Sequence, residues 1–421
     1  MVEDRIFHGE TAMSDNSNQP FIPINKPWMD QREVDAVARP LFSGWVTQGP
    51  EVAAFEKEFS DYVGAKYSCA VSSCTTALHL ALLALGIKLG DEVITVSHSF
   101  IATANAIRYC GATPVFVDID PKTFNIDPAL IERVINPKTR AILCVHQMGM
   151  PCNLELILEI AGKNHLPVIE DAACAIGSEI LWKGNWEKIG KPRGDIACFS
   201  FHPRKLVTTG DGGMLTTGRD DFDRLFRLWR QHGMTVPDTV RHGSKEVVFE
   251  SYTKKGYNYR LTDIQAAVGR EQLKKLPEIL DRRRYLARRY TELLGRIEGV
   301  CTPAEPDWAR SNWQSYCVGL PEGCDQRRVM QFLLDRGIST RRGIMCSHIE
   351  PAYASEPWSC GMGPGPCGCP TGSCRRLFHS EHEQNNSIIL PLFVQMSDED
   401  QDSVVRSLRN ALQPASAGIL H

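Results

Sequence analysis

Short apolar runs alternate with stretches of helical periodicity between Glu51 and about Thr217. The apolar runs predict strands over Tyr67–Val71, Glu92–Val96, Pro114–Asp118, Arg140–His146, Pro167–Glu170, Ile196–Phe201 and Gly213–Thr216. Helices are expected between them over Thr75–Leu85, Ile101–Tyr109, Pro128–Val134 and Leu154–Asn164. Apolar strands separated by helices form largely parallel sheets that are covered on both faces. The pattern therefore predicts an α/β fold with a mostly parallel seven-stranded sheet.

The remainder of the chain has a different pattern. A long charged helix is expected from about Thr262 to Leu293. Pro277 is expected to break or kink this helix, because proline removes one main-chain hydrogen bond and clashes with the preceding turn. After Val300 the signals for helices and strands are mixed, and they end with a helix over Asp398–Leu412. This change predicts a second, smaller α+β domain.

Length and composition limit the classes of function. A chain of 421 residues suits two domains of ordinary size, and we expect a flexible N-terminal arm over residues 1–20, a large domain over 21–290 and a small C-terminal domain over 291–421. The formal net charge of -3 gives no electrostatic reason to expect a nucleic acid or an anionic membrane as partner. No run reaches the roughly 18 apolar residues of a membrane span, and the polar N-terminus does not resemble a signal peptide. We therefore expect a cytoplasmic protein.

Polar clusters follow two of the predicted strands, where an open parallel sheet binds its ligands. The segment Ser72–Thr76 joins a strand to a helix, and hydroxyls and amides at a helix N-terminus form a site for an anion such as a phosphate. An ordinary helix cap is the alternative interpretation. Asp171 follows the apolar run LPVI, and a buried carboxylate needs a cationic partner. That partner is either the protonated ring nitrogen of a cofactor or a structural salt bridge.

A lysine follows a third strand. The segment SFHPRK places Ser200 and Lys205 at the strand end, and the turn GDGG at 210–213 leads back into the sheet. A lysine in an enclosed site can form a Schiff base and move protons, although a lone lysine here would more often be a solvated surface residue. A phosphate site, a buried acid and a lysine in this order are the minimum set for pyridoxal phosphate (PLP), so we expect these three strand ends to meet in one crevice.

Longer motifs extend this interpretation to nearly the whole chain, from about Phe21 to Leu412. These are KPW at 27–29, SGWVTQGPEVAAFEKEF at 43–59, TALHLAL at 76–82, FIATANAIRYCGATPVFVDID at 100–120, EDAACAIGS at 170–178, CFSFHPRKLVTTGDGGMLTT at 198–217, GYNYRLTDIQAAVGREQLKKL at 256–276 and ILPLF at 389–393. With these motifs the sequence resembles the DegT/DnrJ/StrS aminotransferases, the nucleotide-sugar branch of the fold-type I PLP enzymes.

The resemblance implies a role for each matching residue. Lys205 matches the Schiff-base lysine, and Asp171 matches the carboxylate on the pyridine nitrogen. Phe100 matches the aromatic residue that stacks on the cofactor ring. Phosphate ligands are implied at Thr75, Thr76 and Ser200. Asn258, in GYNYR, matches a segment that reaches the phosphate of the neighbouring subunit, which implies a homodimer with shared active sites.

Two cysteines depart from the family pattern at positions that contact the cofactor. Cys74 replaces a glycine or alanine before the threonines, and Cys174 replaces a histidine or glutamine that packs over the ring. The segment RRGIMCSHIEPAY at 341–353 also departs from the family, in a region that contacts the substrate. Substrate contacts are expected from Thr47, His202, Arg260, Arg342 and His348.

The implied reaction is a transamination in two halves. An amino acid, expected to be glutamate, converts PLP to its pyridoxamine form, which then aminates a keto-sugar carried on a nucleotide. Amination of a cyclitol or another small ketone is the nearest alternative. A PLP-dependent sugar dehydratase has histidine at the lysine position, so Lys205 argues against it. A non-catalytic regulatory relative is disfavoured because both Lys205 and Asp171 are retained.

A loop rich in Gly, Pro and Cys lies in the second domain. Its thiols are Cys360, Cys367, Cys369 and Cys374. Four thiols could hold a structural zinc ion. Their spacing lacks the paired CxxC pattern of structural zinc sites, so we expect a metal-free loop, with zinc as the alternative.

Overall fold

The computed structural model describes residues 21–236, 241, 244–361 and 372–413. The predicted arm over residues 1–20 lies outside these ranges. Cys367 and Cys369 of the predicted loop lie outside them as well.

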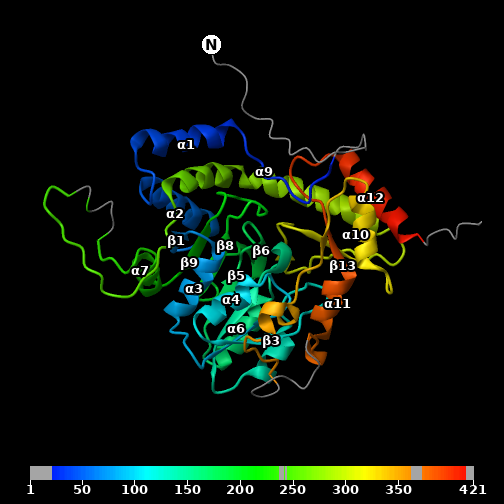
Figure 1. The fold of residues 1–421 in the computed structure, drawn as a ribbon, viewed down its shortest axis with the longest axis horizontal. Helices are drawn as coiled ribbons and strands as arrows, with labels where there is room; N and C mark the ends of the chain where they lie inside the picture. The colour runs from blue at the N-terminus through cyan, green and yellow to red at the C-terminus, as the bar shows by residue number, and fades with distance from the viewer. Residues whose placement is uncertain (1–20, 237–240, 242–243, 362–371, 414–421) are drawn as a thin grey trace, which may run out of the picture.

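A seven-stranded sheet forms the centre of the molecule (Figure 1). Its strands are β1 (Tyr67–Val71), β2 (Glu92–Val96), β3 (Thr113–Val117), β4 (Thr139–Val145), β5 (Val168–Asp171), β8 (Ile196–Ser200) and β9 (Gly213–Thr217). They lie in the order β1-β9-β8-β5-β4-β2-β3, and only β9 runs antiparallel to its neighbours. The predicted α/β fold with a mostly parallel sheet is confirmed, and every predicted strand is present within one residue at each end.

Helices pack on this sheet and on one another. They are α1 (Gln31–Ser43), α2 (Pro50–Val63), α3 (Cys74–Ala84), α4 (Ala102–Tyr109), α5 (Pro128–Ile131), α6 (Leu154–Lys163), α7 (Asp220–Trp229) and α9 (Asp263–Leu294). Helix α3 reads CTTALHLALLA and is buried along most of its length, where it packs against β8, β9 and α4. The carboxyl ends of the parallel strands are thereby fixed next to the start of α3.

Helix α9 is continuous through Pro277. The expected break at this proline is wrong. Leu276, Ile279 and Leu280 on the two sides of Pro277 are buried in the main core, and their packing offsets the one hydrogen bond that proline removes. The helix packs against α1, α2 and the C-terminal helix, and it extends from the sheet to the C-terminal elements (Figure 1).

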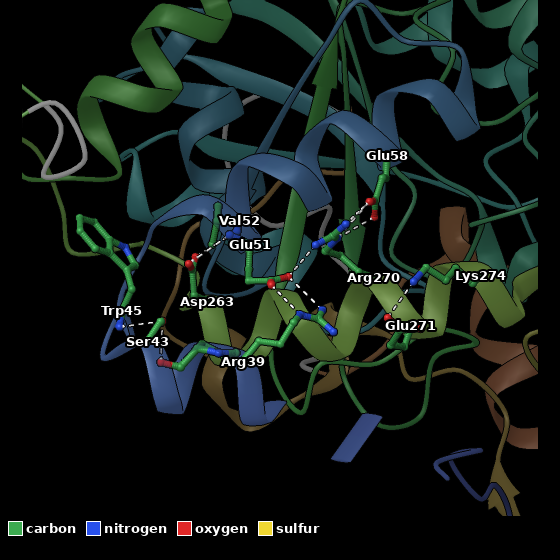
Figure 2. Close-up of polar contacts among 11 residues, drawn as sticks. Arg39, Ser43, Trp45, Glu51, Val52, Glu58, Asp263, Arg270, Glu271 and Lys274 are labelled. Atoms are coloured by element: carbon green, nitrogen blue, oxygen red, sulfur yellow. Dashed lines mark hydrogen bonds and ion pairs between the residues drawn. The ribbon is translucent and has the colours of Figure 1, made fainter. Parts of the chain in front are cut away.

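The start of α9 caps helix α2 (Figure 2). Helix α2 has Gly49 as its own cap residue, with no side chain to accept a hydrogen bond. Instead, the Asp263 carboxylate accepts hydrogen bonds from the amides of Gly49 at 2.7 Å, Val52 at 3.0 Å and Glu51 at 3.1 Å. A residue more than 200 positions away in sequence thus satisfies the amides that α2 leaves free.

The C-terminal part has its own hydrophobic core. Its elements are β11 (Tyr316–Gly319), α10 (Gln326–Leu334), β12 (Arg341–Arg342), α11 (Phe378–Asn386), β13 (Ser387–Leu390) and α12 (Asp398–Leu412). The strands form a sheet in the order β11-β13-β12, and the core includes Leu286, Tyr290 and Leu294 from α9. The helix predicted over Asp398–Leu412 is present as α12. The domain limits at residues 20 and 290 stay a prediction.

A third sheet was not predicted. It consists of β6 (Glu179–Trp182), β7 (Asn185–Lys188) and β10 (Ala309–Arg310). Ile180 is buried, while the rest of the β6–β7 hairpin is mostly half-exposed or exposed, and its apolar run, Ile180–Trp182, is only three residues long. Among the described residues, none of the helices is long and apolar enough to cross a membrane.

Candidate functional site

A cavity of about 460 Å³ lies at the carboxyl ends of the central strands. Its other wall comes from the small sheet, through residues 341–345 and 389–392. The predicted site residues that line it are Cys74, Thr75, Phe100, Asp171, Cys174, Ser200, His202, Lys205 and Arg342. The three strand ends chosen from sequence therefore meet in one cavity.

The N-terminus of α3 forms one end of the cavity. Ser73 caps this helix in a capping box with Thr76, whose hydroxyl donates to the Ser73 carbonyl at 2.7 Å. Thr76 is thus used inside the cap, whereas Ser73, Cys74 and Thr75 line the cavity. A Cβ on Gly213 would lie 2.4 Å from the Ser73 carbonyl carbon, so β9 approaches this turn closely only because Gly213 has no side chain. The first-turn amides of a helix attract anions.

Asp171 is the last residue of β5 and is buried at the base of the cavity. Its carboxylate accepts hydrogen bonds from the Thr103 hydroxyl at 2.8 Å and from the Ala173 amide at 3.1 Å. Burial raises the pKa of Asp171 above its ordinary value, and these two hydrogen bonds only partly oppose the shift. A cationic group in the cavity would stabilise the ionised carboxylate.

Lys205 lies in the turn that follows β8. Its amide donates to the His202 carbonyl at 2.8 Å, and the turn closes where the Thr209 amide donates to the Phe201 carbonyl at 3.0 Å. The Lys205 Nζ donates to the Cys174 Sγ at 3.0 Å. The amine thus faces the cavity with a thiol as its neighbour.

Phe100 and Ser200 complete this part of the cavity. The Phe100 side chain is 63% exposed, so an aromatic face is open to a planar ligand. Ser200 ends β8 opposite Gly213 of β9, and this pairing brings its hydroxyl near the start of α3. A phosphate at the helix, an aldehyde at the lysine and a ring cation at Asp171 would fit this arrangement.

Four further predicted residues do not line the cavity. Thr47 is exposed, and its carbonyl accepts from the Asp263 amide. Asn258 is exposed and forms a bridge with Gln231, while Arg260 forms one with Val71.

The fourth is His348, which is buried with both ring nitrogens engaged, by the Ser97 hydroxyl at 2.6 Å and by Glu381 at 3.0 Å. In this geometry His348 connects structural elements, and the arrangement gives no support to a substrate contact.

Other residues of the site were missed. Thr103 holds the Asp171 carboxylate, and Arg204, Gln314 and Arg341 line the cavity. A hydroxyl in the first turn of the helix after β2 was a usable signal for Thr103. Nothing in the sequence alone marks Gln314, because its placement depends on how the C-terminal part packs.

The cysteine-rich loop is only partly within the described ranges. Cys360 and Cys374 are buried in a small apolar cluster with Leu377 and Phe116. No group of three potential metal ligands converges among the residues that the structure describes. The metal-free loop stays a prediction.

Known proteins resemble this chain over most of its length. Residues 27–409 match the model of the DegT/DnrJ/EryC1/StrS aminotransferase family. The GDP-perosamine synthase of Caulobacter vibrioides is 42% identical over 342 residues, which are 80% of this chain and 88% of that protein. S. venezuelae DesV superposes with a TM-score of 0.81 at 31% identity, covering 94% of this chain and 100% of that one. Helicobacter pylori PseC, an aminotransferase involved in the biosynthesis of pseudoaminic acid, has a TM-score of 0.81 at 26% identity, covering 93% and 99%.

Proposed function

Because the chain belongs to the DegT/DnrJ/EryC1/StrS aminotransferase family, and similar structures include Streptococcus pneumoniae Spr1654 in its PLP and PMP forms, we propose that it moves an amino group from glutamate to a keto-sugar carried on a nucleotide. One observation carries the proposal. The amine of Lys205, the buried carboxylate of Asp171 and the N-terminus of α3 face a single cavity.

Lys205 is the residue proposed to bond the cofactor and to move protons. PLP, when bound, supplies an electron sink for the bond that breaks at the substrate carbon. The Lys205 amine would move the proton at that substrate carbon, which is general acid–base catalysis by a positioned amine. Cys174, 3.0 Å from the Lys205 Nζ, keeps the amine directed into the cavity.

Asp171 and α3 are proposed to orient the cofactor. Asp171 accepts a hydrogen bond from the protonated pyridine nitrogen, and Thr103 holds the carboxylate in place at 2.8 Å. Thr75, Ser200 and the first-turn amides of α3 bind the phosphate. Phe100 packs against one face of the ring, as its exposed position allows.

A homodimer is part of the proposal. Its support is a group of large apolar side chains that remain exposed in a single chain, among them Phe42 at 91% and Phe249 at 88%. Strongly exposed aromatic side chains are common at protein interfaces, where a partner buries them. Asn258, which lies outside the cavity of its own chain, would then face the site of the partner subunit.

The two halves of the reaction give a direct test. Glutamate should convert the purified PLP enzyme to its pyridoxamine form, seen as loss of the visible absorbance band. A panel of nucleotide-linked keto-sugars is then added, and the true acceptor restores the band. The same panel should include free cyclitol ketones. Restoration by a free ketone, but by none of the nucleotide-linked sugars, would contradict the proposed acceptor.

A further inference from the structure

The rim of the cavity carries more positive than negative charge. The charged residues that line the cavity are Arg204, Lys205, Arg341, Arg342, Asp171 and Asp211. Arg342 is neutralised by Glu350, whose carboxylate lies 2.7 Å away. Arg204 and Arg341 form no ion pair with any carboxylate in the described part of the chain. Two guanidinium groups therefore remain uncompensated at the rim.

Hydrogen bonds fix the backbone around Arg204, and its side chain is only partly buried. The Gln314 side-chain amide donates to the Arg204 carbonyl at 3.0 Å, and Asn25 donates to the Pro203 carbonyl at 3.1 Å. The Arg204 amide donates to the His202 Nδ1 at 3.2 Å. A side chain on such a rigid turn loses little further backbone freedom when it binds a ligand.

Arg204 and Arg341 repel each other. Partial burial lowers the pKa of the Arg204 guanidinium, and the charge of Arg341 lowers it further. Burial and the charge of Arg204 also lower the pKa of His202. The two arginines come from different walls, the turn after β8 and strand β12. An anion with two charges placed between them would relieve this repulsion.

The size of the cavity indicates where such an anion lies. A volume of about 460 Å³ is near the lower end of the range for ligand pockets, roughly 300–1,000 Å³. It has to contain the cofactor and the sugar that receives the amino group. The nucleotide of a nucleotide-linked sugar must then project past the rim, so the linking group between them crosses the rim where the two arginines lie.

We propose that Arg204 and Arg341 together bind the diphosphate that links the keto-sugar to its nucleotide. This inference rests on the proposed function. Two guanidinium groups match the two negative charges of a diphosphate, and arginine binds phosphate oxygens in a bidentate fashion. Glutamate carries two carboxylates as well, so charge alone does not separate the two substrates. The proposal assigns the arginine pair to the acceptor, and the donor half-reaction tests this assignment.

The test separates the two substrates. The variants Arg204→Gln and Arg341→Gln are prepared as holoenzymes, together with Arg204→Lys and the control Arg336→Gln, whose side chain stacks on Phe332 in the small domain. Binding of inorganic pyrophosphate, UDP and GDP to the pyridoxamine form is measured by calorimetry. The rate of the glutamate half-reaction is measured separately from the absorbance change. Melting temperatures show that each variant is folded.

Wild type should bind at least one of the diphosphates. Each glutamine variant should bind it about ten- to a hundredfold more weakly, as expected for one charge-assisted contact, with partial recovery in Arg204→Lys and no change in Arg336→Gln. The glutamate half-reaction should stay within about twofold of wild type, since the proposal assigns both arginines to the acceptor.

Three results would overturn the inference: no diphosphate binding by wild type, unchanged binding in both glutamine variants, or an equal loss in the glutamate half-reaction. A wild-type enzyme that binds diphosphate but does not react with glutamate would instead count against the proposed donor.

Discussion

At the scale of single residues, the ionised Asp171 carboxylate lowers the stability of the folded protein when no cofactor is bound. Burial raises its pKa, so the folded apo protein loses stability as the pH rises from the ordinary carboxyl range through the raised value. We expect apo Asp171→Asn to be at least as stable as the apo wild type at neutral pH. The same variant should bind PLP about ten- to a hundredfold more weakly, because a charge-assisted hydrogen bond is lost.

Thermal melts of both proteins, with and without PLP, measure these two effects of Asp171→Asn. The variant should be the more stable of the two at neutral pH without PLP and the less stable with it, and the difference between the apo proteins should shrink at acid pH. An apo variant clearly less stable than the apo wild type at neutral pH would contradict the account of Asp171.

Cysteine reactivity gives a second prediction at this scale. Cys174 lines the cavity beside Lys205, whereas Cys74 is 8% exposed and burial raises its pKa well above the ordinary value. A thiol of raised pKa reacts slowly with alkylating agents. We expect iodoacetamide to label Cys174 of the apo protein and to leave Cys74 unlabelled. Bound PLP should slow labelling of Cys174 about tenfold or more by blocking access, as read by mass spectrometry.

Cys301 serves as the internal control for this labelling experiment. It is exposed and lies away from the cavity lining, so PLP should leave its labelling rate unchanged. Equal labelling of Cys174 with and without PLP would place this thiol outside the cofactor site.

At the scale of elements, the contact between α9 and α2 combines a cap with partly buried ion pairs (Figure 2). Arg270 of α9 contacts Glu58 at 2.6 Å and Glu51 at 2.8 Å on α2, while Lys274 pairs with Glu271 on the surface of α9 itself. Replacing Asp263 by alanine leaves three amides at the start of α2 without their acceptor. This should lower the free energy of unfolding by about 1–3 kcal/mol.

Lys274→Ala is the matched control for Asp263→Ala, and it should cost less than about 0.5 kcal/mol because exposed pairs contribute little. Urea unfolding of both variants provides the comparison. Losses of similar size in the two variants would show that the cap does not stabilise α2.

Elements with a clear apolar pattern could be predicted from sequence, and others could not. Strands β1 and β2 have the predicted limits, because each is a short run of mostly apolar residues that pairs along its whole length in the sheet. The β6–β7 hairpin has little buried surface, and its apolar run is only three residues long, Ile180–Trp182. Strand β12 has only two residues, both exposed. Pairing with β13 determines the position of β12, and this pairing cannot be predicted from the local sequence.

The site was predictable to the extent that it lies on strand ends. Asp171 and Lys205 follow apolar strands and could be identified with their motifs. The sequence shows Arg204 next to Lys205. It does not show that Arg204 lacks an ion pair, because that depends on which carboxylates the fold brings near it. His348 was expected at the substrate, yet its ring is held by Ser97 and Glu381, a contact between distant segments.

At the scale of the whole molecule, the proposed dimer makes the active site a shared structure. Lys205→Ala and Asn258→Ala proteins should each have little activity, because each site would lack one required group. Mixing the two should recover up to about a quarter of wild-type activity, since random exchange gives half hybrid dimers with one intact site each. Activity assays after subunit exchange measure this recovery. A fully active monomer in sedimentation experiments would refute the shared site.

The unbroken course of α9 has a mechanical consequence. Its first half is clamped in the core of the central sheet and its second half in the core of the C-terminal part. The two walls of the cavity belong to these same two cores, so the continuous helix α9 fixes the distance between the walls. A large change in the width of the opening would require α9 to bend. Adjustment to substrates of different size is therefore left to the side chains and turns at the rim.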